Sequence, residues 1–408
     1  MNGSIPSASV ANDRLSDVAL GDRPVHPYLS VAVVMGLSLS LVGPSVSYLE
    51  ERLGVSTSTI GTLFSVIAVS NIAGALVCGR WIERHGGHLA LRLALIGFVA
   101  GTVLLAVGEH YVVVALGVAL IGGSTGVTDA SANTMVVWVR PGRSGPPLNA
   151  LHLMFGLGAL AAPLVSDRSI AWTDRLWPAA IMVGALSVAS LTMIGTKPSP
   201  AFPGELEDDL RPQPSRRTVV TIAAFFILYV GSEVGFAGWI HTYAEDTGLE
   251  GSAPAAVTSV FWAMFALGRL LAVWASRRVS VYRIVVGACT STVVVLSFML
   301  IVRGEEWAVW VGAALFGLAA APQYPTMLAF VDTRIALPAR ATATIVSASA
   351  TGALVVPAAI GVLIDRHGPS SMPAVVLVVS AGTIVGAMVV NRASRADVEA
   401  AAAIPVMR

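Results

Sequence analysis

The sequence predicts an all-α membrane protein whose twelve transmembrane helices form two pseudo-symmetric six-helix bundles. Three observations lead to this prediction. Of the 408 residues, 55% are hydrophobic and only 12% are charged, whereas a soluble domain carries about 25% charged residues. Twelve apolar stretches are each long enough to cross a bilayer. Motifs in the first six stretches recur in the last six, 194 or 195 residues later.

Each apolar stretch is expected to form one helix, because a transmembrane helix needs about 20 mostly apolar residues. The fourth and seventh helices are longer than the hydrocarbon requires, so we expect them to tilt or to extend into water. The predicted helices span 27–49, 58–80, 88–108, 111–139, 148–165, 177–195, 218–244, 254–276, 281–302, 306–330, 338–362 and 372–391.

The basic residues predict the orientation. With the N-terminus inside, 19 Lys and Arg residues fall on the cytoplasmic side and 5 outside, and Arg269 remains within the membrane. Cytoplasmic loops of membrane proteins carry this excess, so both termini are expected in the cytoplasm. The single lysine, against 24 arginines, suggests a GC-rich bacterial genome. We therefore expect a multi-pass protein of a bacterial cell membrane.

A polar segment divides the chain. Residues 196–217 contain five prolines and eight charged residues, a composition typical of an irregular linker. The predicted organisation is a cytoplasmic tail (1–26), an N-terminal six-helix bundle (27–195), a cytoplasmic linker (196–217), a C-terminal six-helix bundle (218–391) and a cytoplasmic tail (392–408).

Three motifs recur in corresponding helices of the two halves. They are G-A-L-x-x-P (158–163 and 352–357), A-L-x-G (119–122 and 314–317) and Y-x-E-E/D (48–51 and 243–246). The first is expected to permit close helix contact and a bend. The acidic residues of the third, including Glu245, are expected to be solvated charges on the outer surface. An internal repeat of this kind is typical of secondary transporters.

Several functions are excluded by composition and motifs. The net charge of +1 gives no electrostatic basis for binding nucleic acid. Cys78 and Cys289 lie inside apolar stretches and are interpreted as core residues, with no disulfide or metal site. No motif of enzyme catalysis or of cofactor binding is present, so we expect neither an enzyme nor a cofactor other than a coupling ion.

The loop after the second helix carries a recognisable motif. Gly79, Glu83, Arg84 and Gly86 follow the spacing of the G-x-x-x-D-R-x-G loop of the major facilitator superfamily, with Glu83 as the acid. The sequence resembles that family over about residues 27–391. The resemblance implies that this loop is a gate, in which the acid caps a neighbouring helix and the arginine bridges the halves in one conformation. The alternative is a plain cytoplasmic turn with positive-inside charge.

Finer motifs narrow the resemblance. The chain is similar to the fucose permeases and their sodium-dependent glucose transporter relatives in the segments 122–133, 148–152, 229–233 and 323–326. The fucose permeases also have an acid four residues before a proline of the first helix, where this chain has Ser40 before Pro44. Their two-acid proton mechanism is therefore not implied for this chain.

Three ionisable residues in the membrane are predicted to couple transport to an ion. Charged groups inside a transmembrane helix usually face a cavity or a partner. Three such residues are Asp129, Glu233 and Arg269. Asp129 could carry a proton, or with Asn133 could offer hard oxygen ligands to sodium. Arg269 could instead pair with either acid in a structural ion pair. Arg269 and Glu233 have no counterpart in the first half, where Ala75 and Ser38 stand.

Polar and aromatic residues in the same helices are predicted to bind the substrate. Amides suit sugar hydroxyls, and aromatic rings suit the apolar faces of sugars. For each aromatic residue the alternative is core packing, and for His152 it is a hydrogen-bonded packing role. The predicted substrate-binding residues are Asn71, Asn133, Asn149, His152, Trp239, Trp262, Gln323 and Tyr324.

Together these observations predict a monomeric carrier that moves a small hydrophilic solute, expected to be a monosaccharide. The halves would rock about a central site in a proton-coupled or sodium-coupled cycle, with proton coupling preferred. Two alternatives stay open. One is a proton-coupled exporter of drugs or secondary metabolites, and the other is a membrane sensor that binds a solute without transporting it.

Overall fold

The computed structural model describes residues 24–140, 145–196, 198–200, 212–335 and 339–402. Within these residues, twelve helical spans are long and apolar enough to cross a membrane, and no strand is present. The elements are α2 (His26–Ser40), η1 (Gly43–Ser45), α3 (Val46–Leu53), α4 (Thr57–His85), α5 (Gly87–Val107), α6 (Tyr111–Val139), α7 (Gly145–Thr173), α8 (Trp177–Ile194), α9 (Arg216–Asp246), α10 (Ala253–Ala275), α11 (Val281–Ile301), α12 (Glu306–Ala320), α13 (Gln323–Asp332), α14 (Ala339–His367), η2 (Pro369–Ser371) and α15 (Met372–Ala402).

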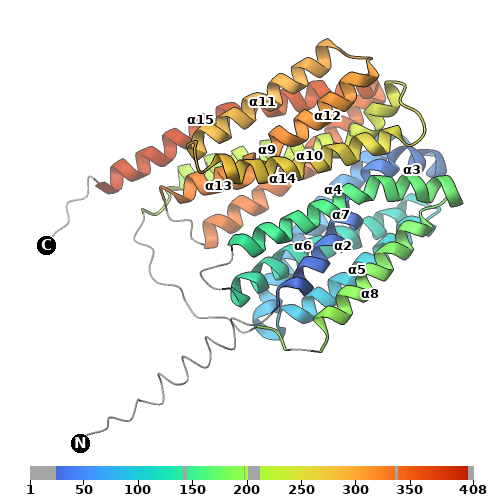
Figure 1. Ribbon diagram of the computed structural model, residues 1–408, viewed down its shortest axis with the longest axis horizontal. Helices are drawn as coiled ribbons and strands as arrows, with labels where there is room; N and C mark the ends of the chain where they lie inside the picture. The colour runs from blue at the N-terminus through green and yellow to red at the C-terminus, as the bar shows by residue number, and fades with distance from the viewer. Residues whose placement is uncertain (1–23, 141–144, 197, 201–211, 336–338, 403–408) are drawn as a thin grey trace, which may run out of the picture.

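The helices form two bundles, as predicted. α2–α8 make the first bundle and α9–α15 the second, and the two lie side by side with the start of α2 and the end of α15 at the same end of the molecule (Figure 1). We call this the linker end, because α8 also ends there and α9 begins there. The bundles meet where α4 packs on α14 and α7 packs on α10.

The repeat in the sequence is visible as repeated contacts. A Cβ atom on Gly158 would lie 2.2 Å from the carbonyl oxygen of Val33, and one on Gly352 would lie 2.0 Å from that of Ile227. Both pairs are related by the same 194-residue shift. The small residue of the G-A-L-x-x-P motif therefore brings α7 against α2 and α14 against α9, because any side chain there would meet backbone.

The A-L-x-G motif acts in the same way. A Cβ atom on Gly122 would lie 2.6 Å from the carbonyl oxygen of Ile67, and one on Gly317 would lie 2.4 Å from that of Phe261. These contacts join α6 to α4 and α12 to α10. The two glycine motifs thus set the helix spacing in both bundles.

Two predicted helices are interrupted, and several are longer than expected, α7 and α15 most of all. The first span breaks at Gly43–Ser45, which contains Pro44, and the tenth breaks between Ala320 and Gln323, at Pro322. Proline lacks the backbone donor that a continuous helix needs. α15 continues to Ala402, beyond the apolar part of its sequence, and Asp397 Oδ2 accepts a 2.9 Å hydrogen bond from the Ser215 backbone N–H at the start of α9.

The two cysteines are buried and free, as expected for core residues.

Candidate functional site

Arg269 is the electrostatic partner that several ionisable side chains share. Its guanidinium carbon is 4.8 Å from the ring centroid of Phe265, one turn earlier on α10. Its side chain interacts electrostatically with five others, contributed by α6, α7, α9 and α13: Asp129, His152, Tyr229, Glu233 and Tyr324. We call these six residues the Arg269 cluster. Both bundles contribute to it.

Asp129 and His152 bring the first bundle into the cluster. Both lie deep within the protein, yet both side chains are exposed. Their side chains are therefore open to solvent-sized molecules although protein surrounds them. Asn133 lies one turn after Asp129, and its amide donates a 2.8 Å hydrogen bond to the Asp129 backbone carbonyl.

Glu233, Tyr229 and Tyr324 form the other side of the cluster. The Tyr229 hydroxyl lies beside the Glu233 carboxylate, but it makes no hydrogen bond of good geometry with the described residues. The Tyr229 and Tyr324 rings are 6.0 Å apart between centroids, and Phe226 lies 4.6 Å from Tyr324. This aromatic packing holds Tyr324 at the cluster.

Arg269 is not locked into an ion pair. Neither Asp129 nor Glu233 lies within 4.0 Å of its nitrogens, and its buried Nε has no hydrogen-bond partner in the described part of the chain. The guanidinium therefore interacts with both acids at longer range. Asp129 belongs to the first bundle and Glu233 to the second, so the guanidinium interacts with one acid from each bundle.

Trp262 lies next to the cluster, at the contact between the bundles. Its ring is 6.2 Å from that of Phe155 on α7, and 5.6 Å from that of Phe265. The Arg269 guanidinium in turn lies over the Phe265 ring. Trp262 is 8% exposed, so most of its ring is occupied by this packing.

The side chains of Gln323 and Trp239 form hydrogen bonds with residues outside the Arg269 cluster. Gln323 is buried against α11, where its Oε1 accepts from Cys289 Sγ at 3.4 Å and its Nε2 donates to Thr292 Oγ1 at 3.4 Å. Trp239 is fully buried and donates a 2.9 Å hydrogen bond from Nε1 to the Pro357 carbonyl oxygen. The structure therefore does not bring these two predicted residues into the cluster.

The remaining predicted residues have more limited descriptions. Asn71 is half-buried on α4, where its backbone faces Gly126 of α6. Gly79 is exposed, and Gly86 ends α4 with φ of 79°. The side chains of Asn149, Glu83 and Arg84 lie outside the described residues.

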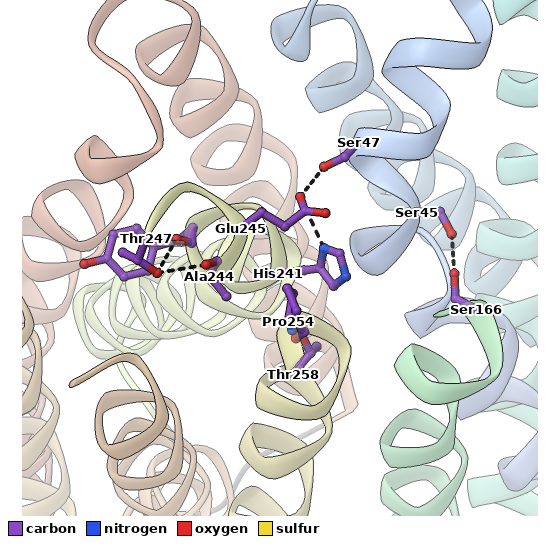
Figure 2. A network of polar contacts seen from close by, with 10 residues as sticks. Ser45, Ser47, Ser166, His241, Ala244, Glu245, Thr247, Pro254 and Thr258 are labelled. Atoms are coloured by element: carbon purple, nitrogen blue, oxygen red, sulfur yellow. Dashed lines mark hydrogen bonds and ion pairs between the residues drawn. The ribbon is translucent and has the colours of Figure 1, made fainter. Parts of the chain in front are cut away.

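The bundles are joined on the side away from the linker end, by residues for which the sequence predicted no functional role. Glu245 of α9 accepts a hydrogen bond from Ser47 Oγ of α3, and its Oε2 lies 3.6 Å from His241 Nδ1 (Figure 2). The expectation that Glu245 is only a solvated charge was therefore wrong, although its side chain is 38% exposed. The sequence signal that could have indicated this contact was the recurrence of the Y-x-E-E/D motif in the two halves.

Further hydrogen bonds reinforce this contact. The Ser58 backbone N–H donates to Asp365 Oδ2 at 3.0 Å, Ser65 Oγ to the Leu354 carbonyl at 2.9 Å, and Ser259 Oγ to the Leu160 carbonyl at 2.9 Å. These three hydrogen bonds and the one between Ser47 and Glu245 all lie in the halves of their helices that are away from the linker end. Together with Ser47 and Glu245, we call these residues the closing contact.

A family model described as the Major Facilitator Superfamily matches residues 28–357. The chain belongs to the Major Facilitator Superfamily. The chain is therefore a multi-pass membrane transporter and not an enzyme.

Named relatives are distant. The chain is 24% identical to sodium-dependent glucose transporter 1A of Mus musculus, over 82% of this chain and 88% of that protein. It is 24% identical to sodium-dependent glucose transporter 1 of Xenopus laevis, over 80% and 73%. A crystal structure of a mutant of the nucleoside transporter NupG has a similar fold, with a TM-score of 0.69 at 13% identity, covering 90% of this chain and 99% of that one.

Proposed function

We propose that this superfamily member imports a monosaccharide across the cell membrane by alternating access, coupled to a proton that Asp129 carries. It would act as a monomer with both termini in the cytoplasm. One observation carries the proposal. Arg269 of the second bundle interacts with Asp129 of the first and Glu233 of its own bundle, without a close ion pair to either.

This arrangement supplies a coupling mechanism. When the bundles rock, the separation between Arg269 and Glu233 changes little, because both residues belong to one bundle. The separation between Arg269 and Asp129 changes, because it spans both. Protonation of Asp129 removes its charge and with it an attraction between the bundles. The proton would therefore bias the rocking equilibrium, as coupling requires.

The Arg269 cluster, together with Asn133 one turn after Asp129, suits a sugar. His152 and Asn133 offer hydrogen-bonding groups, and Tyr324 offers a ring and a hydroxyl. The curated relatives described above are named as glucose transporters, which supports a monosaccharide within this range of solutes. Import would proceed from the side of the closing contact to the linker end, where the positive-inside pattern puts the cytoplasm.

Sodium is the second candidate for the coupling ion, because the relatives are named as sodium-dependent. Asp129 and Asn133 could supply carboxylate and amide oxygens, which suit a hard cation. The described residues contain no group of three or more His, Cys, Asp or Glu side chains that could hold a metal ion. A sodium site here would depend on amide, backbone and water oxygens.

Uptake into proteoliposomes tests the proposal. A panel of monosaccharides is offered with a proton gradient, with a sodium gradient and with neither, to wild type and to Asp129→Asn. We expect accumulation of at least one sugar with the proton gradient. Asp129→Asn should lose accumulation but retain exchange of labelled sugar down its gradient, because the site remains while its charge change does not.

Asp174→Asn is the matched control, because Asp174 is exposed at the end of α7. It should accumulate sugar like wild type. Accumulation by Asp129→Asn would overturn the assignment of Asp129, and dependence on sodium alone would favour the second candidate. No uptake of any sugar, together with efflux of an apolar compound, would overturn import of a monosaccharide.

A further inference from the structure

A groove separates two consecutive helices of the second bundle. α10 and α11 both pack on α12, and a cavity of about 780 Å³ remains between them. Gly268 holds α10 close to α12, since a Cβ atom there would lie 2.4 Å from the Leu318 carbonyl oxygen. Gly287 of α11 lines the groove and has open space beside it, with nothing within 4 Å of an added Cβ atom.

The groove faces the lipid and is mostly apolar. Leu271 of α10, Val294 of α11 and Leu315 of α12 line it, with exposed fractions of 46%, 61% and 43%. Large apolar side chains exposed at this depth of a membrane protein contact acyl chains. The groove is separate from the Arg269 cluster, and no residue of that cluster lines it.

One end of the groove is basic. Arg283, at the start of α11, lines this end. Arg277 and Arg278 lie in the turn between α10 and α11, and the Arg278 guanidinium carbon is 4.6 Å from the ring centroid of Trp274. Residues 251–304, which include both helices, contain no Asp or Glu. These arginines therefore have no acid within their own helical hairpin.

The dimensions match one lipid chain. From Arg283 to Val295, the groove follows α11 for twelve residues, which is about 18 Å at 1.5 Å per residue. The hydrocarbon of one leaflet is about 15 Å thick. An acyl chain that fills the groove would therefore place its headgroup at the level of the arginines, with exposed Trp274 at the same interface, a common position for tryptophan.

We propose that this groove binds one anionic phospholipid. An acyl chain lies between α10 and α11 on the floor of α12, and Arg283 binds the phosphate with Arg277 and Arg278 beside it. Arginine forms strong charge-assisted hydrogen bonds to phosphate oxygens, and basic clusters at the membrane surface attract anionic lipids. The anionic class follows from the absence of acids in this hairpin, because a zwitterionic headgroup would leave the cluster unneutralised.

Lipid binding is tested on the full-length protein, delipidated in detergent and titrated with equal amounts of phosphatidylglycerol and phosphatidylcholine. Native mass spectrometry counts each lipid retained. Wild type should retain one phosphatidylglycerol in at least fivefold preference over phosphatidylcholine. Arg283→Gln should lower this preference to about twofold or less, and adding Arg277→Gln and Arg278→Gln should abolish it.

Two further variants distinguish lipid binding in the groove from a general effect of positive charge on lipid binding. Gly287→Phe fills the groove from a position with open space, so it should fold normally and lose the retained lipid. Arg303→Gln removes an exposed arginine at the other end of α11 and should bind like wild type. Equal retention of both lipids by wild type, or unchanged binding in Arg283→Gln or Gly287→Phe, would overturn the proposal. An equal loss in Arg303→Gln would also overturn it.

Discussion

Gly61 of α4 and Gly361 of α14 face each other across the boundary between the bundles. A Cβ atom on Gly61 would lie 3.5 Å from the Gly361 Cα. Trp239 closes the space beside them, because its Cζ2 would lie 3.3 Å from a Cβ on Gly61 and 3.0 Å from one on Gly361. The contact is therefore tight, and a side chain larger than a methyl group at either position would meet Trp239 or the facing glycine.

A larger residue at this contact should hold the bundles apart. Gly361→Leu is expected to reduce transport by at least tenfold and to increase hydrogen exchange of the amides in residues 57–65. The reason is that a leucine cannot fit between Gly61 and Trp239 without separating α4 from α14. Gly184→Leu is the control, because Gly184 has open space around it. Normal exchange in Gly361→Leu would contradict a tight contact.

The hydrogen bond between Ser47 and Glu245 should stabilise the closed arrangement modestly. A hydrogen bond of this kind contributes about 1 kcal/mol, which corresponds to about a fivefold change in the population of the opened state. Ser47→Ala should produce that change and Glu245→Ala at least that change, because Glu245→Ala also removes the contact with His241. Hydrogen exchange at the ends of α3 and α9 measures both. The double variant should be no worse than Glu245→Ala alone, because that variant already lacks the hydrogen bond from Ser47.

Glu250→Ala removes an exposed acid from the loop after α9 and should leave this exchange unchanged. Additive effects of Ser47→Ala and Glu245→Ala would show that the two side chains act separately.

Removal of the Arg269 charge should destabilise the fold through the acids it leaves behind. Loss of one partner from a buried charged group costs about 3–5 kcal/mol, and the cost here should lie below that range because Asp129 is accessible. Arg269→Gln should therefore lower the melting temperature, and Arg269→Gln with Asp129→Asn should recover part of the loss. Thermal unfolding in detergent measures both.

Arg366→Gln is the control for charge alone, since Arg366 is exposed. A double variant less stable than Arg269→Gln would show that Asp129 is not stabilised by the arginine.

The two glycines of the loop motif should respond differently to substitution. Gly86 has φ of 79° and ψ of 155°, a region that is essentially restricted to glycine and costs about 1–3 kcal/mol for other residues. A Cβ atom there would also lie 2.6 Å from Ser199 Oγ, which accepts a hydrogen bond from the His88 backbone. Gly86→Ala should therefore lower the melting temperature. Gly79→Ala, at an open helical position, should not, and equal losses would contradict the backbone argument.

Most of the fold could be predicted because helix length and hydropathy are properties of a local segment. The helix predicted at 111–139 is observed at Tyr111–Val139. The extension of α15 to Ala402 was missed because alanine-rich polar residues form a helix in water without a hydropathy signal. The break of the tenth span was missed although Pro322 marks it, because apolar residues resume at Met327 after the short segment 323–326.

The site was only partly predictable, because the sequence does not determine the rotation of each helix. Asp129, Glu233 and Arg269 could be selected from the cost of placing ionisable groups in a membrane. The same reasoning selected Gln323, whose amide is indeed buried but is satisfied by α11, while adjacent Tyr324 joins the cluster. Tyr229 was missed, because a tyrosine in an apolar helix looks like ordinary core packing.

The hydrogen bond from Ser215 to Asp397 has a practical consequence for anyone who engineers this protein. The final helix is 31 residues long, or about 46 Å, so it projects beyond a hydrocarbon layer of about 30 Å and fastens the beginning of α9. A fluorescent fusion or affinity tag should accordingly be joined after Ala402. Removal of the charged turns at the end of α15 would remove Asp397, and with it the hydrogen bond that holds the start of α9.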